Sequence, residues 1–262
     1  MSAVSIIGLG WVGEPLAVSL KQQGFEVYGS VRRPEKAAAL QIQGIQAEIW
    51  QHEQMLPEML KQSIVVVTLP PGKTPDYVQS LQQLFLQLKK TTQQLIFFSS
   101  TSVYSGVGVF DESSPLEPES VQAAAIIEVE TLLQQMNFPN WKIIRPSGLI
   151  SASRHPARFL SGKQRDGGKK PVNLVHQSDV IAAVKALIDY PDSGVFNLAS
   201  PSHPTRNEFY SSACLVLGLA LPQFTDEPST GKVISGEKIE TLTSFQYHIR
   251  DWMSWQKEGM YS

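Results

Sequence analysis

The chain has 262 residues, of which 42% are hydrophobic, and its formal net charge is −2. This composition is typical of an ordinary globular protein and offers no basic patch for nucleic acid or for an acidic membrane surface, so we expect no nucleic-acid and no membrane partner. A single cysteine, Cys214, excludes an intrachain disulfide and a four-cysteine zinc site, and no His and Cys residues have metal-ligand spacing, so we expect no metal.

Targeting and membrane segments are not evident in the sequence. No stretch approaches the roughly 18 consecutive apolar residues of a membrane span. The first residues lack a basic stretch followed by an apolar segment and a small-residue cleavage site. We therefore expect a cytoplasmic protein.

A glycine-rich turn follows the first expected strand, which covers residues 3–8. In this turn Gly8 permits the tight bend, Gly10 lets the backbone approach a pyrophosphate, and Gly13 lets the next helix pack closely on the strand. The amino end of that helix can then direct its N–H groups at phosphates. An ordinary strand-turn-helix is the alternative. The pattern predicts a dinucleotide site contacted by Gly8, Gly10, Trp11, Val12 and Gly13.

The second expected strand, residues 25–30, ends without an acidic residue. An Asp or Glu at this place would accept a hydrogen bond from the ribose 2′-hydroxyl of NAD. Instead the chain continues with Arg32 and Arg33, and a guanidinium can pair with the 2′-phosphate of NADP. The sequence therefore predicts NADP, with NAD less favoured and both arginines in the cofactor site. Solvated charges at a strand end are the alternative.

Strand and helix patterns alternate over the first 100 residues, which predicts parallel strands joined by crossover helices. Leu69 and Pro70 break the fourth unit at the carboxyl end of its strand, where a cofactor would lie, so we expect both to contact it. The fourth and fifth strands are continuous apolar runs, as expected for central strands covered on both faces. The remaining elements of this part are strands near 44–49, 64–69 and 94–99 and a helix at 75–90.

Residues 99–118 are rich in Ser, Gly, Pro and acidic residues, which predicts a long loop. A long loop in a compact domain is usually functional. The pattern loosens beyond residue 150, where a basic loop covers 151–170. The other expected elements are helices at 120–136, 178–190 and 206–217, strands at 141–146, 172–175 and 195–198, and a short helical patch in the last 45 residues.

Several motifs follow one another along nearly the whole chain. They are the glycine turn, Arg32, Leu69-Pro70-Pro71, Ser99-Ser100-Thr101-Ser102-Val103-Tyr104, Ile144-Arg145-Pro146-Ser147-Gly148, Asn173-Leu174-Val175-His176 with Asp179, and Phe196-Asn197-Leu198. In this order they resemble the extended and atypical short-chain dehydrogenases, which include NAD-dependent sugar-nucleotide epimerases and dehydratases. The resemblance implies an α/β fold: a Rossmann-type doubly wound parallel sheet with a small C-terminal substrate-binding region. We expect an NADP-binding domain over 1–150 and a mixed substrate-binding region over 151–262 that contributes elements back to the core.

Two departures from the family pattern bear on activity. Extended members usually carry Gly-x-x-Gly-x-x-Gly, whereas Ile7 stands at the first glycine and Gly8 one residue later. Active members also carry Tyr-x-x-x-Lys on the helix after the serine motif, where the lysine lowers the tyrosine pKa so that it exchanges a proton with the substrate. Here the helix expected at 120–136 holds neither residue type, and Gln122 and Ile126 stand at those places. Any acid-base machinery must therefore differ from the family's.

Ser100 and His176 are the remaining candidate catalytic residues. Ser100 aligns with the family's active-site serine, whose hydroxyl contacts a substrate oxygen; a serine that satisfies a strand-end N–H is the alternative. His176 titrates near neutrality when unperturbed, and the family places this segment beside the substrate. Capping of the next helix is the alternative for His176. Tyr104 is expected to pack below the site.

Basic residues gather in the loop that the family places over the substrate cavity. Arg154, Arg158 and Lys163 there would suit a phosphate or carboxylate, so we expect them, with Ser100 and His176, to bind the ligand. A solvated basic loop is the alternative.

The leading hypothesis is an NADP-binding oxidoreductase or epimerase that acts on a small anionic or sugar-nucleotide-like ligand. The alternative is a non-catalytic NADP-responsive binding or regulatory module, which the missing dyad keeps open. Either a monomer or a homodimer is compatible with the sequence.

Overall fold

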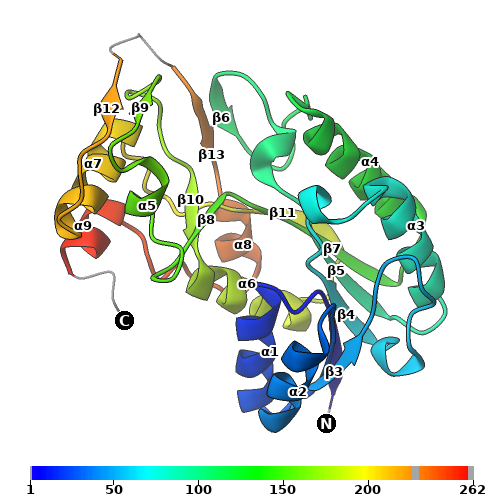
Figure 1. Ribbon diagram of the computed structural model, residues 1–262. Helices are drawn as coiled ribbons and strands as arrows, with labels where there is room; N and C mark the ends of the chain where they lie inside the picture. The colour runs from blue at the N-terminus through cyan, green and yellow to red at the C-terminus, as the bar shows by residue number, and fades with distance from the viewer. Residues whose placement is uncertain (1, 226–229, 259–262) are drawn as a thin grey trace. The chain divides into compact units, whose positions relative to one another are not determined.

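The computed structural model describes residues 2–225 and 230–258 (Figure 1). The chain forms two compact units, each built from three segments. The first unit comprises Met1–Val103, Glu117–Arg145 and Val184–Val195, and the second comprises Tyr104–Leu116, Pro146–Ala183 and Phe196–Ser262.

A seven-stranded parallel sheet forms the centre of the fold, with the strand order β11-β7-β5-β4-β1-β2-β3. The order reverses between β1 and β4, which is the arrangement of a doubly wound sheet. In such sheets ligands bind outside the carboxyl ends of the strands at the reversal. The predicted fold class is therefore confirmed. The strands are β1 (Ala3–Ile7), β2 (Glu26–Val31), β3 (Gln46–Ile49), β4 (Ile64–Val67), β5 (Gln94–Phe98), β7 (Asn140–Pro146) and β11 (Gly194–Leu198).

Burial explains why the central strands have continuous apolar sequences. All five residues of β5 are buried, and three of the four residues of β4 are buried. Strands covered on both faces cannot alternate apolar and polar side chains, because neither face meets water.

Helices α1 (Gly13–Gln22), α2 (Pro34–Ile42), α3 (Tyr77–Leu88) and α4 (Val121–Gln135) belong to the first unit. The predicted apolar stripe of α3 is buried at Leu81, Leu84, Phe85 and Leu88. Phe85 packs edge-on against Phe97 of β5, with ring centroids 6.0 Å apart. Helices α3 and α4 pack against each other, side by side in Figure 1.

Three two-stranded parallel ladders and several short helices build the second unit. The ladders join β8 (Gly148–Ile150) to β10 (Leu174–His176), β9 (Gln164–Arg165) to β12 (Gln223–Phe224), and β6 (Gly108–Phe110) to β13 (Lys232–Ile234). Its helices are α5 (Ala157–Leu160), the first part of α6 (Gln177–Asp189), α7 (Arg206–Val216), α8 (Glu237–Leu242) and α9 (Trp252–Lys257).

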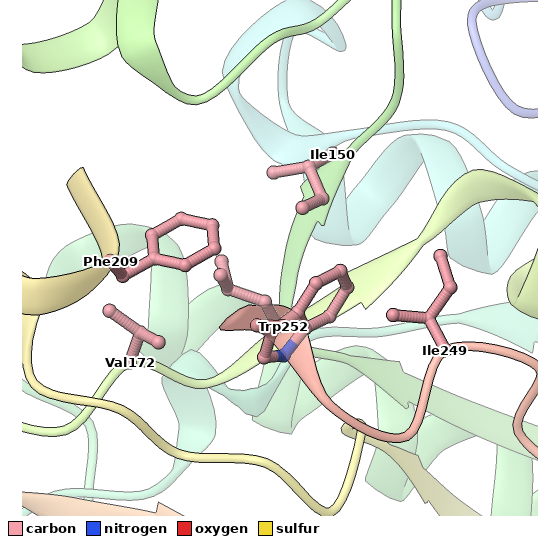
Figure 2. Packing of buried hydrophobic residues seen from close by; sticks show 6 residues of the cluster. Ile150, Val172, Phe209, Ile249 and Trp252 are labelled. Atoms are coloured by element: carbon pink, nitrogen blue, oxygen red, sulfur yellow. The ribbon is translucent and has the colours of Figure 1, made fainter. Parts of the chain in front are cut away.

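Trp252 of α9 lies at the centre of the core of the second unit. Figure 2 shows Ile150, Val172, Phe209 and Ile249 around its indole ring. Trp252 itself has no exposed area. Two backbone N–H groups just before α9, those of His248 and Ile249, donate to the buried Asp179 carboxylate at 3.0 and 3.3 Å. The first-turn carboxylate of α6 therefore anchors the C-terminal segment to this core.

Four local expectations need correction. The segment expected as a loop over 99–118 contains a 3-10 turn at Thr101–Val103 and the strand β6, and the basic loop expected over 151–170 contains α5 and β9. The strand expected at 172–175 lies at Leu174–His176, and the tail holds two helices, α8 and α9, rather than one patch. Each missed element is only two to six residues long, which is too short to establish a periodic pattern.

Within residues 2–225 and 230–258, no helix is both long and apolar enough to cross a membrane.

Candidate functional site: a glycine turn at the strand order reversal

The glycine turn lies at the carboxyl end of β1 and is held by both neighbouring strands. The Gly8 N–H donates to Ser30 Oγ of β2 at 2.9 Å, and Thr68 Oγ1, just after β4, donates to the Gly8 carbonyl at 2.6 Å. Gly8 has a φ of +105°, a conformation that side-chain-bearing residues rarely adopt, and a Cβ there would lie 2.9 Å from Thr68 Oγ1. The turn is therefore rigidly placed where the strand order reverses.

Gly13 and Gly10 are required for different reasons. A Cβ on Gly13 would lie 2.2 Å from the Gly8 carbonyl oxygen, so close packing of α1 on the turn demands glycine there. A Cβ on Gly10 would meet nothing within 4 Å, and Gly10 is exposed. Open space at Gly10 is what the approach of a pyrophosphate to the backbone requires.

Helix α1 begins directly at this open space. Its N-cap residue, Val12, offers no side-chain cap for the first N–H groups. The amino end of a helix carries partial positive charge and attracts phosphate. The first-turn carboxylate of Glu14 would oppose an anion, but it pairs with Lys36 at 2.7 Å.

Leu69 reaches the same turn from β4. Its Cδ2 would lie 3.2 Å from a Cβ on Gly8, and Pro70 follows as the N-cap of a 3-10 turn at Pro71–Lys73. Gly8 and Leu69, predicted separately from two distant motifs, are thus neighbours. Sequence reasoning missed Ser30 and Gly29, which shape the turn from β2: a Cβ on Gly29 would lie 2.6 Å from Leu9 Cδ1. The glycine inside an expected strand was the available signal.

Arg32 and Arg33 are exposed and follow β2 at its carboxyl end, as the sequence predicted. Arg33 is the N-cap residue of α2 in extended conformation. Both arginines therefore belong to the unit that carries the glycine turn.

A buried polar cluster joins three elements of the first unit. Ser99, directly after β5, donates a hydrogen bond to Glu130 of α4, and Arg145 of β7 holds the same carboxylate through Nε at 2.9 Å and Nη2 at 2.5 Å. Glu130 is 1% exposed and Arg145 is 3% exposed. Burial and the Glu130 charge raise the pKa of Tyr77 on α3. Sequence reasoning did not pair these residues, because nothing in their spacing indicates contact.

Ser100 is partly exposed next to this cluster, and its Oγ accepts from the Ser102 N–H at 3.1 Å. The Ser102 N–H belongs to the 3-10 turn at Thr101–Val103 and not to the end of β5, so the ligand role of Ser100 stays a prediction. On α4, Gln122 is exposed and Ile126 is buried, and the helix Val121–Gln135 contains neither tyrosine nor lysine.

His176 lies in the second unit at the start of α6. Its Nδ1 accepts from the Ser178 N–H at 3.2 Å and lies 2.7 Å from Ser178 Oγ. Burial, and then the nearby His248, lower the pKa of His176 to about 4. The imidazole is therefore neutral near pH 7, and its observed bonds are those of a helix cap.

The three basic residues of the predicted ligand loop are exposed and also belong to the second unit. The Arg154 guanidinium stacks over the Phe159 ring at 5.7 Å, and Lys163 Nζ donates to the Phe159 carbonyl at 2.9 Å. Arg158 lies between them on α5. The structure thus organises Arg154 and Lys163 around one aromatic residue.

Among the residues that the structure describes, no three His, Cys, Asp or Glu side chains are grouped so as to hold a metal ion.

The sheet order and the glycine turn together define a Rossmann-type α/β protein. An NAD(P)H-binding family model matches residues 8–191, and the chain belongs to that family. It is 34% identical over 267 residues to Protein YeeZ of Escherichia coli strain K12, covering 96% of this chain and 97% of that protein.

Solved structures with the same fold include proteins described as epimerases and as a short-chain dehydrogenase/reductase superfamily protein. MoeE5 in complex with UDP-glucose and NAD superposes with a TM-score of 0.79 at 18% identity, covering 99% of this chain and 100% of that one. UDP-glucuronic acid 4-epimerase from Bacillus cereus in complex with NAD gives 0.80 at 17% identity, with coverages of 98% and 96%. At these identities the likeness shows the fold alone.

Proposed function

We propose that the protein is an NADP-dependent oxidoreductase or epimerase that acts on a small anionic or sugar-nucleotide-like ligand. The observation that carries the proposal is the open space at Gly10, which directly precedes the amino end of α1. A pyrophosphate in that space would meet backbone N–H groups and no obstructing side chain. The NAD complexes of MoeE5 and of the B. cereus epimerase support a nicotinamide dinucleotide as the occupant.

The preference for NADP rests on the residues after β2. Neither Arg32 nor Arg33 could accept from a ribose 2′-hydroxyl, whereas each could donate to a 2′-phosphate. The exposure of both guanidinium groups at the carboxyl end of β2 supports this role. Charge-assisted hydrogen bonds of this kind contribute roughly 1.5–3 kcal/mol.

The ligand class rests on two separate grounds. The UDP-sugars bound by MoeE5 and named for the epimerase support a sugar nucleotide. The exposed guanidinium groups of Arg154 and Arg158 and the ammonium of Lys163 support phosphate or carboxylate. In this proposal Ser100 and His176 contact the ligand, and the low pKa of His176 favours hydrogen bonding over proton donation.

A non-catalytic NADP-responsive module is the second candidate. The residues at the two dyad positions of α4 favour it. Ile126, at the place of the family's lysine, is buried and apolar, and Gln122 has no acidic proton to exchange. Product analysis after incubating the cofactor-loaded protein with UDP-glucose or UDP-glucuronic acid separates the two candidates. Conversion supports the enzyme, and tight cofactor binding without conversion of either compound supports the module.

Cofactor choice is tested by calorimetric titration with NADPH and NADH. We expect NADPH to bind about ten- to a hundredfold more tightly, and Arg32→Ala to remove most of that difference while leaving NADH affinity nearly unchanged. Lys90→Ala, which removes one exposed positive charge beyond the carboxyl end of α3, is the control and should keep the preference. Equal affinity of the unaltered protein for both cofactors contradicts the NADP assignment.

A further inference from the structure

His155 is a buried histidine inside an exposed basic segment of the second unit. Its side chain is 3% exposed, whereas its neighbours Arg154 and Arg158 are exposed. Buried polar groups in folded proteins are almost always hydrogen-bonded. We therefore expect each ring nitrogen of His155 to have a hydrogen-bond partner.

One ring nitrogen of His155 has its partner within the loop. Nδ1 accepts from the Ala157 N–H at 3.1 Å, so Nδ1 carries a lone pair and not a proton. Burial lowers the pKa of His155, and the positive charge of Arg158 lowers it further. The ring is consequently neutral near pH 7, and its single proton lies on Nε2.

The Nε2–H group is a donor without an acceptor. Nε2 is buried and has no hydrogen-bond partner among residues 2–225 and 230–258. His203, elsewhere in the second unit, differs in that a ring nitrogen meets the Val172 carbonyl oxygen at 3.0 Å. Among the described residues five buried side-chain atoms have no partner, and Nε2 of His155 is the one that lies within the exposed basic segment. A buried polar group without a partner calls for an explanation, and a bound ion or ligand is one such explanation.

The surroundings favour a negatively charged acceptor. A hydroxyl group or water at Nε2 would bring its own proton and need a further acceptor, whereas a phosphate or carboxylate oxygen needs only donors. The same segment carries two exposed arginines: Arg158, whose positive charge lowers the pKa of the ring, and Arg154, which precedes His155 in the chain. Positive charge beside an unfilled N–H is the arrangement that binds an oxyanion.

We infer that the His155 Nε2–H donates a hydrogen bond to a phosphate or carboxylate oxygen of the ligand, beside the positive charge of Arg158. The inference rests on the proposed function, to which it adds the residue that recognises the anionic group. Nε2 is buried in this structure, so a ligand reaches it only when the side chains that cover it move.

Two substitutions separate the two ring nitrogens. In His155→Asn the amide oxygen can still accept from the Ala157 N–H, but nothing replaces the Nε2 donor. In His155→Gln the longer side chain can bring an N–H to the position of Nε2. We expect His155→Asn to weaken binding of inorganic phosphate and of UDP-glucuronic acid about tenfold or more, and His155→Gln to weaken it less.

The unaltered protein provides a second measurement that does not depend on a variant. With ¹⁵N-labelled histidine, inorganic phosphate should shift the Nε2 resonance of His155 and leave that of His203 in place. A resonance that stays fixed at saturating phosphate, or unchanged phosphate affinity in His155→Asn, overturns the inference. NADPH affinity, measured in parallel, tests the proposed function separately. If NADPH binds tightly but phosphate does not shift the His155 resonance, the inference about His155 is wrong and the proposed function is not contradicted.

Discussion

Glycine at positions 10 and 13 illustrates how one residue type meets two different demands. At Gly13 the demand is internal, because the Gly8 carbonyl oxygen would lie 2.2 Å from an added Cβ. At Gly10 no protein atom within 4 Å excludes a side chain. The space at Gly10 is therefore consistent with a role in ligand approach and not with a need of the fold.

Alanine substitution should consequently affect cofactor binding at Gly10 and the stability of the fold at Gly13. Gly10→Ala should change the free energy of unfolding by less than ~1 kcal/mol and strongly weaken NADPH binding, because the methyl group enters the space for the pyrophosphate. Gly13→Ala should destabilise the fold by ~1–3 kcal/mol or more, a cost larger than the ~1 kcal/mol that alanine gains in helix propensity.

Urea denaturation and calorimetric titration measure the two effects. If Gly10→Ala binds NADPH as tightly as the unaltered protein, the cofactor does not occupy the space at the turn.

Strand β7 carries a charged side chain on each face of the sheet, and each of these side chains contacts a residue in a helix or directly after one. Lys142 and Arg145 are three residues apart, so their side chains leave opposite faces of the sheet. Arg145 holds Glu130 of α4, and Lys142 Nζ donates to the carbonyl of Tyr190, just beyond α6, at 2.7 Å. Both cations are nearly or fully buried. A helix on either face is thus tied to the same strand by a charged side chain.

Burial of Lys142 predicts a dependence of stability on pH. Burial lowers the pKa of Lys142 to about 8 from 10.5, with Asp192 opposing the shift. Between these values the unfolded chain binds more protons than the folded chain, so stability rises with pH across this window, by ~1.4 kcal/mol per pH unit at most. Lys142→Met should lack this rise, whereas exposed Lys90→Met should retain it.

The measurement is the free energy of unfolding of the three proteins at pH 7.5 and pH 10. Other groups titrate in this range, so the difference between each variant and the unaltered protein is the quantity of interest. Parallel changes in all three proteins contradict the assignment to Lys142.

Both units share continuous secondary structure. Helix α6 runs from Gln177 to Asp189, and the division between units falls at residue 183; strand β11 is divided after Val195. A helix cannot lose its carboxyl half without fraying the hydrogen bonds of the other half. Unfolding of one unit therefore removes support from the other.

Calorimetry should accordingly show one cooperative transition for the whole chain. NADPH at a hundred times its dissociation constant should stabilise the folded state by ~2.7 kcal/mol and move the entire transition upward. Two resolved transitions, of which NADPH moves only one, show instead that the units unfold independently.

Local sequence was sufficient for much of the first unit. The apolar runs of β4 and β5 and the stripe of α3 were predicted within two residues of their bounds, because burial on one or both faces imposes a period that neighbouring residues display. The glycine turn was recognisable for a related reason. Its backbone conformation and close packing restrict the residues at fixed, short spacing.

Only the tertiary structure could establish the contacts between distant segments. Ser99, Glu130 and Arg145 meet because β5, α4 and β7 pack together, and β6 becomes a strand only because β13, more than a hundred residues later, pairs with it. Likewise, nothing in the spacing of residues 151–163 indicates that His155 is buried, and only the fold shows that its Nε2 has no partner among the described residues. Sequence by itself determined the longer elements of the first unit and the glycine turn, since both depend on near neighbours. The buried hydrogen bonds depend on which polar side chains the fold buries next to one another. Spacing along the chain does not show which residues these are.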